Sequence, residues 1–338
     1  TLDRVDAFPG PSPMLLAPAR RFITPPDATG LTPFSWALCG LLFTASAVTV
    51  RYFGFSVAVP PALIACAVAT GVILFLMRDS DLARRVPALT LGCLLYVLFG
   101  LQSLAAVVLS YTVLATNLPL ADGVFLGLDR ALGFDWLAFR QSVLAFPILE
   151  KLLAQAYASL PIQFAIIPAV LLATGRVRRI EALLAALIIC EIVACLVSAL
   201  WPCAGMASSE GFQAVAAATP GATPLSQYLP VRDGSLRTLD AMKLFGLISF
   251  PSFHCAAAYL AVAALWPLRW TRAPMLLLNG AMTVSAVTHG AHYLADCVAG
   301  LGLAALAFPL CQHAVRRSAA GAAHRAAPAS MAAGEAAA

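Results

Sequence analysis

Long apolar runs separated by short polar or basic segments make up most of the chain. Spanning the hydrocarbon core of a bilayer takes about 20 apolar residues in a helix. Runs of roughly that length cover residues 34–51, 58–77, 88–115, 152–174, 180–200, 252–268, 273–290 and 293–314. The pattern predicts an all-α fold, a polytopic membrane helix bundle with about eight transmembrane helices.

Two of the connecting segments are long. Residues 116–151 contain an amphipathic stretch, which suits a helix lying in the membrane interface with Trp136 at headgroup level; a plain interfacial spacer is the alternative. Residues 201–251 are rich in Pro and Gly, which predicts a turn-rich loop that folds over nearby residues as a lid.

Composition supports a membrane protein. Hydrophobic residues make up 61% of the 338 residues and charged residues only 11%, and the mean hydropathy is +0.87. These values exclude an ordinary soluble domain. Most of the nine cysteines lie inside apolar runs, which indicates small buried side chains rather than a disulfide framework.

The net charge of +5 indicates topology rather than nucleic-acid binding, because Lys and Arg form small clusters between the apolar runs instead of one basic face. The clusters alternate along the chain, and one side of the predicted bundle carries 14 of the 21 basic residues. Cytoplasmic segments carry the excess of Lys and Arg, so both termini are predicted to be cytoplasmic.

Two short stretches near the C-terminus carry the chemistry, Pro-Ser-Phe-His at 251–254 and Thr-His-Gly-Ala-His-Tyr-Leu-Ala-Asp at 288–296. His292 and Asp296 are four residues apart, so they share a helix face and can touch. The charge alternation places His254 with them at the outer face. Ionisable groups at membrane depth are costly, which makes these three residues a candidate functional site.

This set of residues suits phosphoryl transfer. A neutral imidazole can attack phosphorus when a carboxylate holds its other nitrogen, and His292 with Asp296 meets that requirement. His254 can protonate the leaving oxygen and later deprotonate the incoming water or alcohol. The chemistry needs no metal or other cofactor.

The phosphate also needs hydrogen-bond donors and cations. A helix that starts at Pro251 would leave the amides of Ser252, Phe253 and His254 free for an anion. The cationic candidates for the transition state, all just upstream on the same side, are Arg237 and Lys243, with Arg232 weaker.

The order Pro-Ser-x-His, followed about forty residues later by His-x-x-x-Asp, resembles the type 2 phosphatidic acid phosphatase (PAP2) superfamily and its phosphohistidine mechanism. The bulky residue in Pro-Ser-Phe-His and the Thr-His-Gly-Ala-His-Tyr run look most like the inositol phosphorylceramide synthase branch and its bacterial relatives. The resemblance implies a lipid phosphate substrate, a periplasmic site on a bacterial inner membrane, and roles for His292 as nucleophile, Asp296 as its partner and His254 as acid.

The resemblance also implies a division of the chain. A cytoplasmic tail (1–33) precedes N-terminal helices and an interfacial segment (34–149), within which the helix at 88–115 belongs to a six-helix core. Residues 150–315 form the main part of that catalytic core. The Ala-rich segment 316–338 is predicted to be a disordered cytoplasmic tail.

This sequence departs from the superfamily at the basic positions. The first motif falls at Ala194 and Trp201-Pro202, and the pair that opens the third motif is Ser285-Ala286, so three cations of the classical phosphatases are missing. Either Arg237 and Lys243 replace them or the protein has lost activity.

Other interpretations of the polar residues remain open. His254, His289, His292 and Asp296 suit zinc by their spacing, which would give a zinc-dependent lipid hydrolase; a transporter or scaffold is the non-enzymatic alternative. Taken alone, His289 is favoured as a packed, hydrogen-bonded core residue. Glu191, inside an apolar run, is either an acid in the substrate pocket or a carboxylate bonded to a neighbouring helix.

Overall fold

The computed structural model describes residues 31–77, 87–208 and 224–326, together with residues 212, 215, 218 and 219. Most of the predicted N-terminal tail and residues 327–338 of the predicted C-terminal tail lie outside this range. Within the described part, regular structure is helical apart from two strands of three residues each.

The helices follow the apolar runs closely. They are α1 (Pro33–Tyr52), α2 (Pro61–Met77), α4 (Pro87–Leu114), α5 (Asp122–Ala131), α6 (Trp136–Leu144), α7 (Pro147–Ala158), α8 (Leu160–Ala173), α9 (Val177–Leu200), α10 (Leu225–Asp233), α11 (Phe253–Leu265), α12 (Arg272–Thr288) and α13 (Leu294–Ala326). Four of them begin at proline, whose fixed φ angle suits the first helical turn and whose missing N–H costs nothing there.

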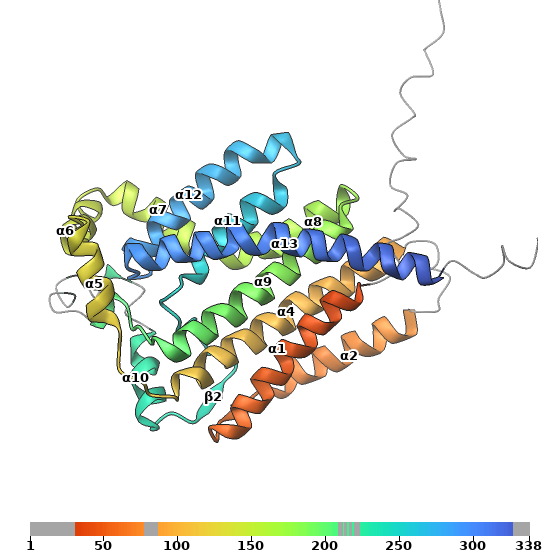
Figure 1. Ribbon diagram of the computed structural model, residues 1–338, viewed down its shortest axis with the longest axis horizontal. Coiled ribbons are helices and arrows are strands. Elements are labelled where there is room, and N and C mark those ends of the chain that lie inside the picture. The colour runs from red at the N-terminus through yellow and green to blue at the C-terminus, as the bar shows by residue number, and fades with distance from the viewer. Residues whose placement is uncertain are drawn as a thin grey trace, which may run out of the picture.

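Helix α9 is the centre of the bundle. It packs against α4, α11 and α13, while α1 lies on α4 and α12 lies on α11 (Figure 1). Its side chains are buried on nearly every face, among them Leu183, Leu184 and Ile188. A helix that is apolar all round is stable only when other helices surround it.

The number of membrane-spanning helices is lower than the eight predicted. In the described residues, four helices are long and apolar enough: α1, residues 92–114 of α4, α9, and residues 294–321 of α13. The bent pair α7 and α8 makes a fifth if it counts as one span, with a bend of 56°. The run predicted as one helix at 152–174 breaks at Ser159, immediately before Leu160 and Pro161.

The run at 252–268 forms a helix of only 13 residues, because Ser252 caps its start and Pro267 follows its end. At 1.5 Å per residue such a helix is about 20 Å long, shorter than the hydrocarbon core of about 30 Å. Helices α2 and α12 have 17 residues each, which is also shorter than the roughly 20 residues of a typical spanning helix. The fold is a polytopic helical membrane protein with unequal helices.

The starts of α1 and α9 and the end of α13 meet at one end of the bundle. Glu181 accepts hydrogen bonds from the amide and hydroxyl of Thr32 (both 2.6 Å) and the hydroxyl of Ser35 (2.8 Å). The Phe34 amide donates to the Ser318 hydroxyl at 3.4 Å. The side chain of Arg179 donates to carbonyls at the end of α11, so the basic clusters after α8 and α11 share this end, as the charge alternation predicted.

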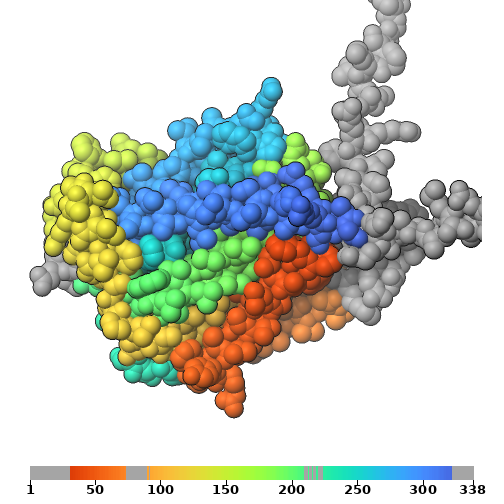
Figure 2. All heavy atoms as spheres, viewed as in Figure 1, coloured from red at the N-terminus to blue at the C-terminus, as the bar shows by residue number. Residues whose placement is uncertain are grey.

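The opposite end holds the long loops. Strand β1 (Ser56–Ala58), between α1 and α2, pairs in parallel with β2 (Thr238–Asp240) from the 201–251 segment. Helices α5 and α6 close the bundle on this side, beside the start of α13 (Figures 1 and 2).

Trp136 packs inside the protein. Its side chain is 3% exposed and donates from Nε1 to the carbonyl of Val287 in α12 (2.8 Å), so it does not face lipid headgroups; that this segment lies at the membrane interface stays a prediction. Arg140 of the same helix is fully buried and forms an ion pair with Glu150.

Helix α13 also differs from the prediction, because it continues to Ala326 through part of the segment 316–338 that was predicted to be disordered. Alanine has the highest helix propensity, so an Ala-rich stretch readily extends a helix that is already formed.

Candidate active site

The turn between α12 and α13 places the two motif residues His292 and Asp296. The chain reverses through Gly290 and Ala291, and Ala291 adopts a left-handed φ of 55°. A Cβ on Gly290 would lie 2.6 Å from the Ala286 carbonyl oxygen, so only glycine fits there. The amide of Met206 donates to the Ala291 carbonyl (2.8 Å) and holds the turn from outside.

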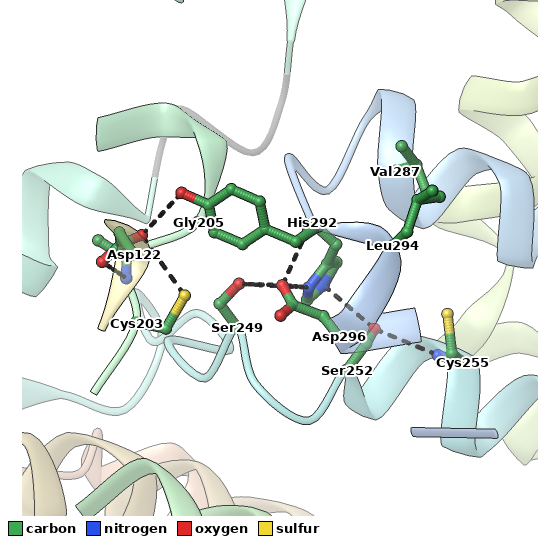
Figure 3. Close-up of polar contacts among 12 residues, drawn as sticks. Asp122, Cys203, Gly205, Ser249, Ser252, Cys255, Val287, His292, Leu294 and Asp296 are labelled. Carbon is green, nitrogen blue, oxygen red and sulfur yellow. Dashed lines mark hydrogen bonds and ion pairs between the residues drawn. The ribbon is translucent and has the colours of Figure 1, made fainter. Parts of the chain in front are cut away.

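His292 and Asp296 form the predicted pair. Nδ1 of His292 lies 3.2 Å from Oδ2 of Asp296, and the carboxylate is fully buried. The same oxygen accepts from the Ser249 hydroxyl (2.7 Å) and the Tyr293 amide (3.0 Å). The carboxylate thereby assigns the proton to Nδ1, and the lone pair stays on Nε2, which lies 3.2 Å from the Ser252 hydroxyl (Figure 3).

Burial by itself lowers the pKa of His292, but its hydrogen bond to Asp296 and the negative charge of that carboxylate outweigh this effect. The pKa of His292 is therefore above its usual value.

His254 approaches from α11. Ser252 caps this helix, accepting from the Cys255 amide at 3.4 Å, and His254 is its second residue. The imidazole stacks on Tyr157 of α7, with ring centroids 4.2 Å apart and planes 12° apart. The ring centroid of His254 is 6.4 Å from that of His292, so both imidazoles can reach one phosphoryl group.

A cavity of about 130 Å³ joins the two histidines. Its lining also includes Ser110, Tyr157, Glu191, Ser249, Phe253 and Gly290. Residues 246–249, from the segment predicted to be a lid, form one wall. In the described part of the chain, the lining contains no Lys or Arg.

The predicted amide cluster at the start of α11 is partly used by the fold. The Ser252 amide donates to the Asp296 carbonyl (2.9 Å), so the expectation that it is free is wrong. The amides of Phe253 and His254 occupy the first two helical positions, where no intrahelical acceptor exists. Two donors and the positive end of the helix dipole therefore remain for an anion.

Comparison with known proteins gives one match. A sequence profile described as the PAP2 superfamily covers residues 124–310, more than half of the chain, and includes both histidines and the aspartate of the site. The chain belongs to the PAP2 superfamily. The match begins within α5, after α4. The searches of curated proteins and of solved structures returned no match.

Membership in the PAP2 superfamily indicates a membrane phosphatase or phosphotransferase that acts on lipid phosphates. The predicted site residues His254 of α11 and His292 of the α12–α13 turn line one cavity, and Asp296 of α13 is buried beside His292. Ser252 contacts both members of that pair, since its amide donates to the Asp296 carbonyl and its hydroxyl lies 3.2 Å from Nε2 of His292.

The predicted basic residues are not brought to this PAP2 site. Arg237 donates to the Val231 carbonyl (2.6 Å) and stacks on Phe55. Lys243 is exposed and pairs with Asp240 at 3.4 Å. The third, Arg232, donates to a carbonyl in the segment after α4 (2.5 Å). Each charge has a partner elsewhere, so this arrangement does not support their contact with the phosphate.

The zinc interpretation needs His289 beside the other ligands, and the structure places it differently. His289 is buried, with Nε2 3.2 Å from Glu150 and Nδ1 2.8 Å from the Thr288 hydroxyl. Among the described residues no three His, Cys, Asp or Glu side chains have metal-ligating geometry. His289 is the bonded core residue that was the favoured interpretation.

Two acids on α5 support the catalytic turn of this PAP2 protein and were missed by the sequence reasoning. Asp129, 1% exposed, accepts from the Leu294 amide (3.2 and 3.1 Å) and caps the start of α13. Asp122 accepts from the Tyr293 hydroxyl (3.1 Å) and the Ala204 amide (3.1 Å) (Figure 3). Their spacing of seven residues on an amphipathic helix puts both on one face, which is the signal that was available.

Glu191 lies at a cavity and is also bonded to a neighbouring helix, which were the two alternatives for it. It lines the cavity with the two histidines and is 8% exposed. When the Gln102 amide is oriented to satisfy its neighbours, its nitrogen donates from α4 to Glu191 at 2.5 Å. A carboxyl group is therefore fixed in the wall of the cavity by a bond to the next helix.

Proposed function

We propose that this PAP2 protein is a membrane lipid phosphatase or phosphotransferase that works through a phosphohistidine on His292. The observation that carries the proposal is the pairing of this ring with the buried Asp296 carboxylate through Nδ1, at a cavity that His292 and His254 both line. In the proposed reaction Nε2, which lies 3.2 Å from the Ser252 hydroxyl, exchanges that contact for the phosphorus of the substrate.

In the first step, the lone pair on Nε2 of His292 attacks phosphorus and the bond from phosphorus to the leaving alkoxide breaks. Burial and the neighbouring His292 lower the pKa of His254 to about 3 in the free protein, so the proposed role requires that His254 take up a proton from solvent when the anionic phosphate binds. His254 then gives this proton to the leaving oxygen, and the departing group leaves as a neutral alcohol. The imidazole of His292 becomes cationic, and Asp296 stabilises the charge through the Nδ1 proton.

In the second step, neutral His254 takes a proton from water or from an alcohol as its oxygen attacks phosphorus. The bond between Nε2 and phosphorus breaks, and its electron pair returns to His292. The amides of Phe253 and His254, with the Ser252 hydroxyl, hold the non-bridging oxygens in both steps.

The lack of Lys and Arg in the described lining bears on the substrate. A phosphate monoester carries up to two negative charges and calls for several cations, whereas a phosphodiester carries one. Two amides, a hydroxyl and a helix dipole suit the single charge better. This supports a phospholipid diester as donor and a place for the protein in the inositol phosphorylceramide synthase-like branch, with an alcohol as acceptor.

The location of the reaction is part of the proposal. The alternation of 14 against 7 basic residues supports an active site on the non-cytoplasmic face, which is periplasmic in a bacterial inner membrane. The site lies at a helix end, near headgroup depth, so the reacting phosphorus belongs to a lipid of the outer leaflet. Residues 246–249, which form one wall of the cavity, would limit water there and let an alcohol compete as acceptor.

The test is a comparison of two histidine variants. Detergent-solubilised protein is incubated with a phospholipid labelled in its headgroup phosphate, and label bound to protein and label transferred to water or alcohol are both measured. His292→Ala is expected to abolish both, whereas His289→Ala keeps at least a tenth of the rate, because only His292 has Asp296 one turn away. Equal loss in both variants would contradict the phosphohistidine assignment.

A further inference from the structure

A second cavity lies between α11, α12 and α13, apart from the active site. Its volume is about 570 Å³. Most of its walls are apolar or small side chains, including Ala258, Val262, Leu276, Leu301 and Phe308. Near it, Trp266 and Leu276 present 45% and 50% of their surface outward, so the cavity is a groove on the side of the bundle that faces lipid.

A basic pocket of about 230 Å³ adjoins this groove at the α9 start and the α13 end. It is lined by Gly175, Arg176, Val177, Arg178, Arg179, Gln312 and Arg316. Arg179 and Gln312 line both cavities, so the groove leads directly into the pocket.

The charges in the pocket are only partly compensated. Arg178 pairs with Glu181 at 2.8 Å, and Arg179 donates to the carbonyls of Ala263 and Ala264. No Asp or Glu belongs to the described lining. Arg176 adds a third cation, whose guanidinium donates to the Thr174 carbonyl at 3.0 Å. Exposed Arg316 supplies a fourth. An anion would relieve the repulsion among them.

The distance between the two sites fits a bilayer. Asp296 and Arg316 lie on α13, twenty residues apart, so along the helix they are separated by about 30 Å, the thickness of the hydrocarbon core. Because residues 294–321 of α13 are long and apolar enough to cross a membrane, the active site at the start of this helix and the basic pocket near its end would lie at headgroup depth in opposite leaflets. A lipid in the groove would have its chains in the hydrocarbon and its headgroup at the arginines.

We propose that this second site binds one anionic phospholipid of the leaflet opposite the active site, with an acyl chain in the α11–α12–α13 groove and the phosphate among Arg176, Arg179 and Arg316. Charge complementarity selects the occupant, because any lipid can fill an apolar groove but only an anionic one matches the pocket. Each arginine is expected to contribute on the order of fivefold in affinity.

The test measures binding and does not depend on the proposed activity. Full-length protein is reconstituted into phosphatidylcholine nanodiscs, and the binding of labelled phosphatidylglycerol is compared with that of labelled phosphatidylcholine. Arg176→Gln combined with Arg316→Gln is expected to weaken phosphatidylglycerol binding by at least tenfold. The control pair Arg269→Gln and Arg317→Gln removes the same charge at the same end, outside the pocket, and is expected to change it by less than twofold.

The groove is tested separately. A Cβ on Gly280, which lines the groove, would meet no atom within 4 Å, so the side chain of Gly280→Leu starts in open space, extends into the groove and should reduce lipid binding. Gly302→Leu, equally unhindered and outside the groove, should leave binding unchanged. The proposal would be overturned by equal affinity for the two lipids or by equal effects of the two arginine pairs. Full competition by inorganic phosphate would also overturn it, because the pocket would then be a site for free anions.

Discussion

Asp296→Asn isolates the electrostatic part of the proposed mechanism. Three donors, from His292, Ser249 and Tyr293, converge on Oδ2 of Asp296. Oδ1 is buried and has no hydrogen-bond partner among the described residues. Asparagine can place its carbonyl oxygen at the Oδ2 position and accept all three bonds, so the tautomer of His292 is kept. What it loses is the negative charge.

The size of that loss follows from the distance. Two unit charges 3.2 Å apart, at an effective dielectric constant of 20, attract by about 5 kcal/mol. This attraction is present when His292 is cationic, as in the phosphoryl transition state, and absent in the free enzyme at pH values above the raised pKa of His292, where the ring is neutral. Each 1.36 kcal/mol is a factor of about ten, so Asp296→Asn should slow phosphohistidine formation by roughly 10³ to 10⁴-fold.

Single-turnover labelling of the protein by a phosphate-labelled phospholipid measures this step directly. Thermal unfolding of the variant should stay close to that of the wild type, because the hydrogen bonds survive. Asp233→Asn, at an exposed carboxylate away from the site, is the control and should label at the normal rate. A labelling rate for Asp296→Asn within tenfold of wild type would refute the reasoning, since no cation would then form beside residue 296.

The remaining predictions concern pH, the basic loop and topology. Because the pKa of His292 is raised in the folded protein, its cation stabilises the fold fully below about pH 6.5. That stability should be lost as pH rises through the raised pKa while activity increases over the same window, which pH-dependent unfolding and rate measurements will compare with His292→Gln. Lys243→Gln and Arg237→Gln should each cost less than tenfold in rate, since neither residue lines the cavity; a loss near 10²-fold would show that the loop carries them to the phosphate. A single cysteine at Ser235 should react with a membrane-impermeant thiol reagent in intact cells and one at Arg178 should not, and the reverse labelling would place the site in the cytoplasm.

Local sequence signals predicted the elements well. The predicted helix at 180–200 and the observed α9 end at the same residue, and 88–115 differs from α4 by one residue at each end. Proline starts and apolar length are local properties, so they can be read from sequence. The sequence did not predict the bend between α7 and α8 or the short length of α11. Both were missed because hydropathy is averaged over a window of residues, and a window hides a Ser-Leu-Pro break or a single capping residue.

The site was predictable where residues close in sequence share a helix turn. His292 and Asp296 follow from their spacing, and His254 follows from the family motif. Ser249 and the two acids of α5 act across 47 to 171 residues of sequence, and no periodicity connects them to the turn. The exposure of Lys243 was also hidden, because a loop cation has the same sequence signal whether it faces a phosphate or solvent.

The N-terminal helices lie outside the family match, yet the packing makes them hard to remove. A truncated protein that begins at α5 would lose Thr32 and Ser35, and the buried Glu181 would keep Arg178 as its ion-pair partner without these three hydrogen bonds. It would also expose the edge of β2, whose neighbour β1 lies between α1 and α2. Unpaired strand edges invite pairing with other chains. The minimal matched segment is therefore a poor choice for expression, and the boundary of the family profile is not the boundary of the folding unit.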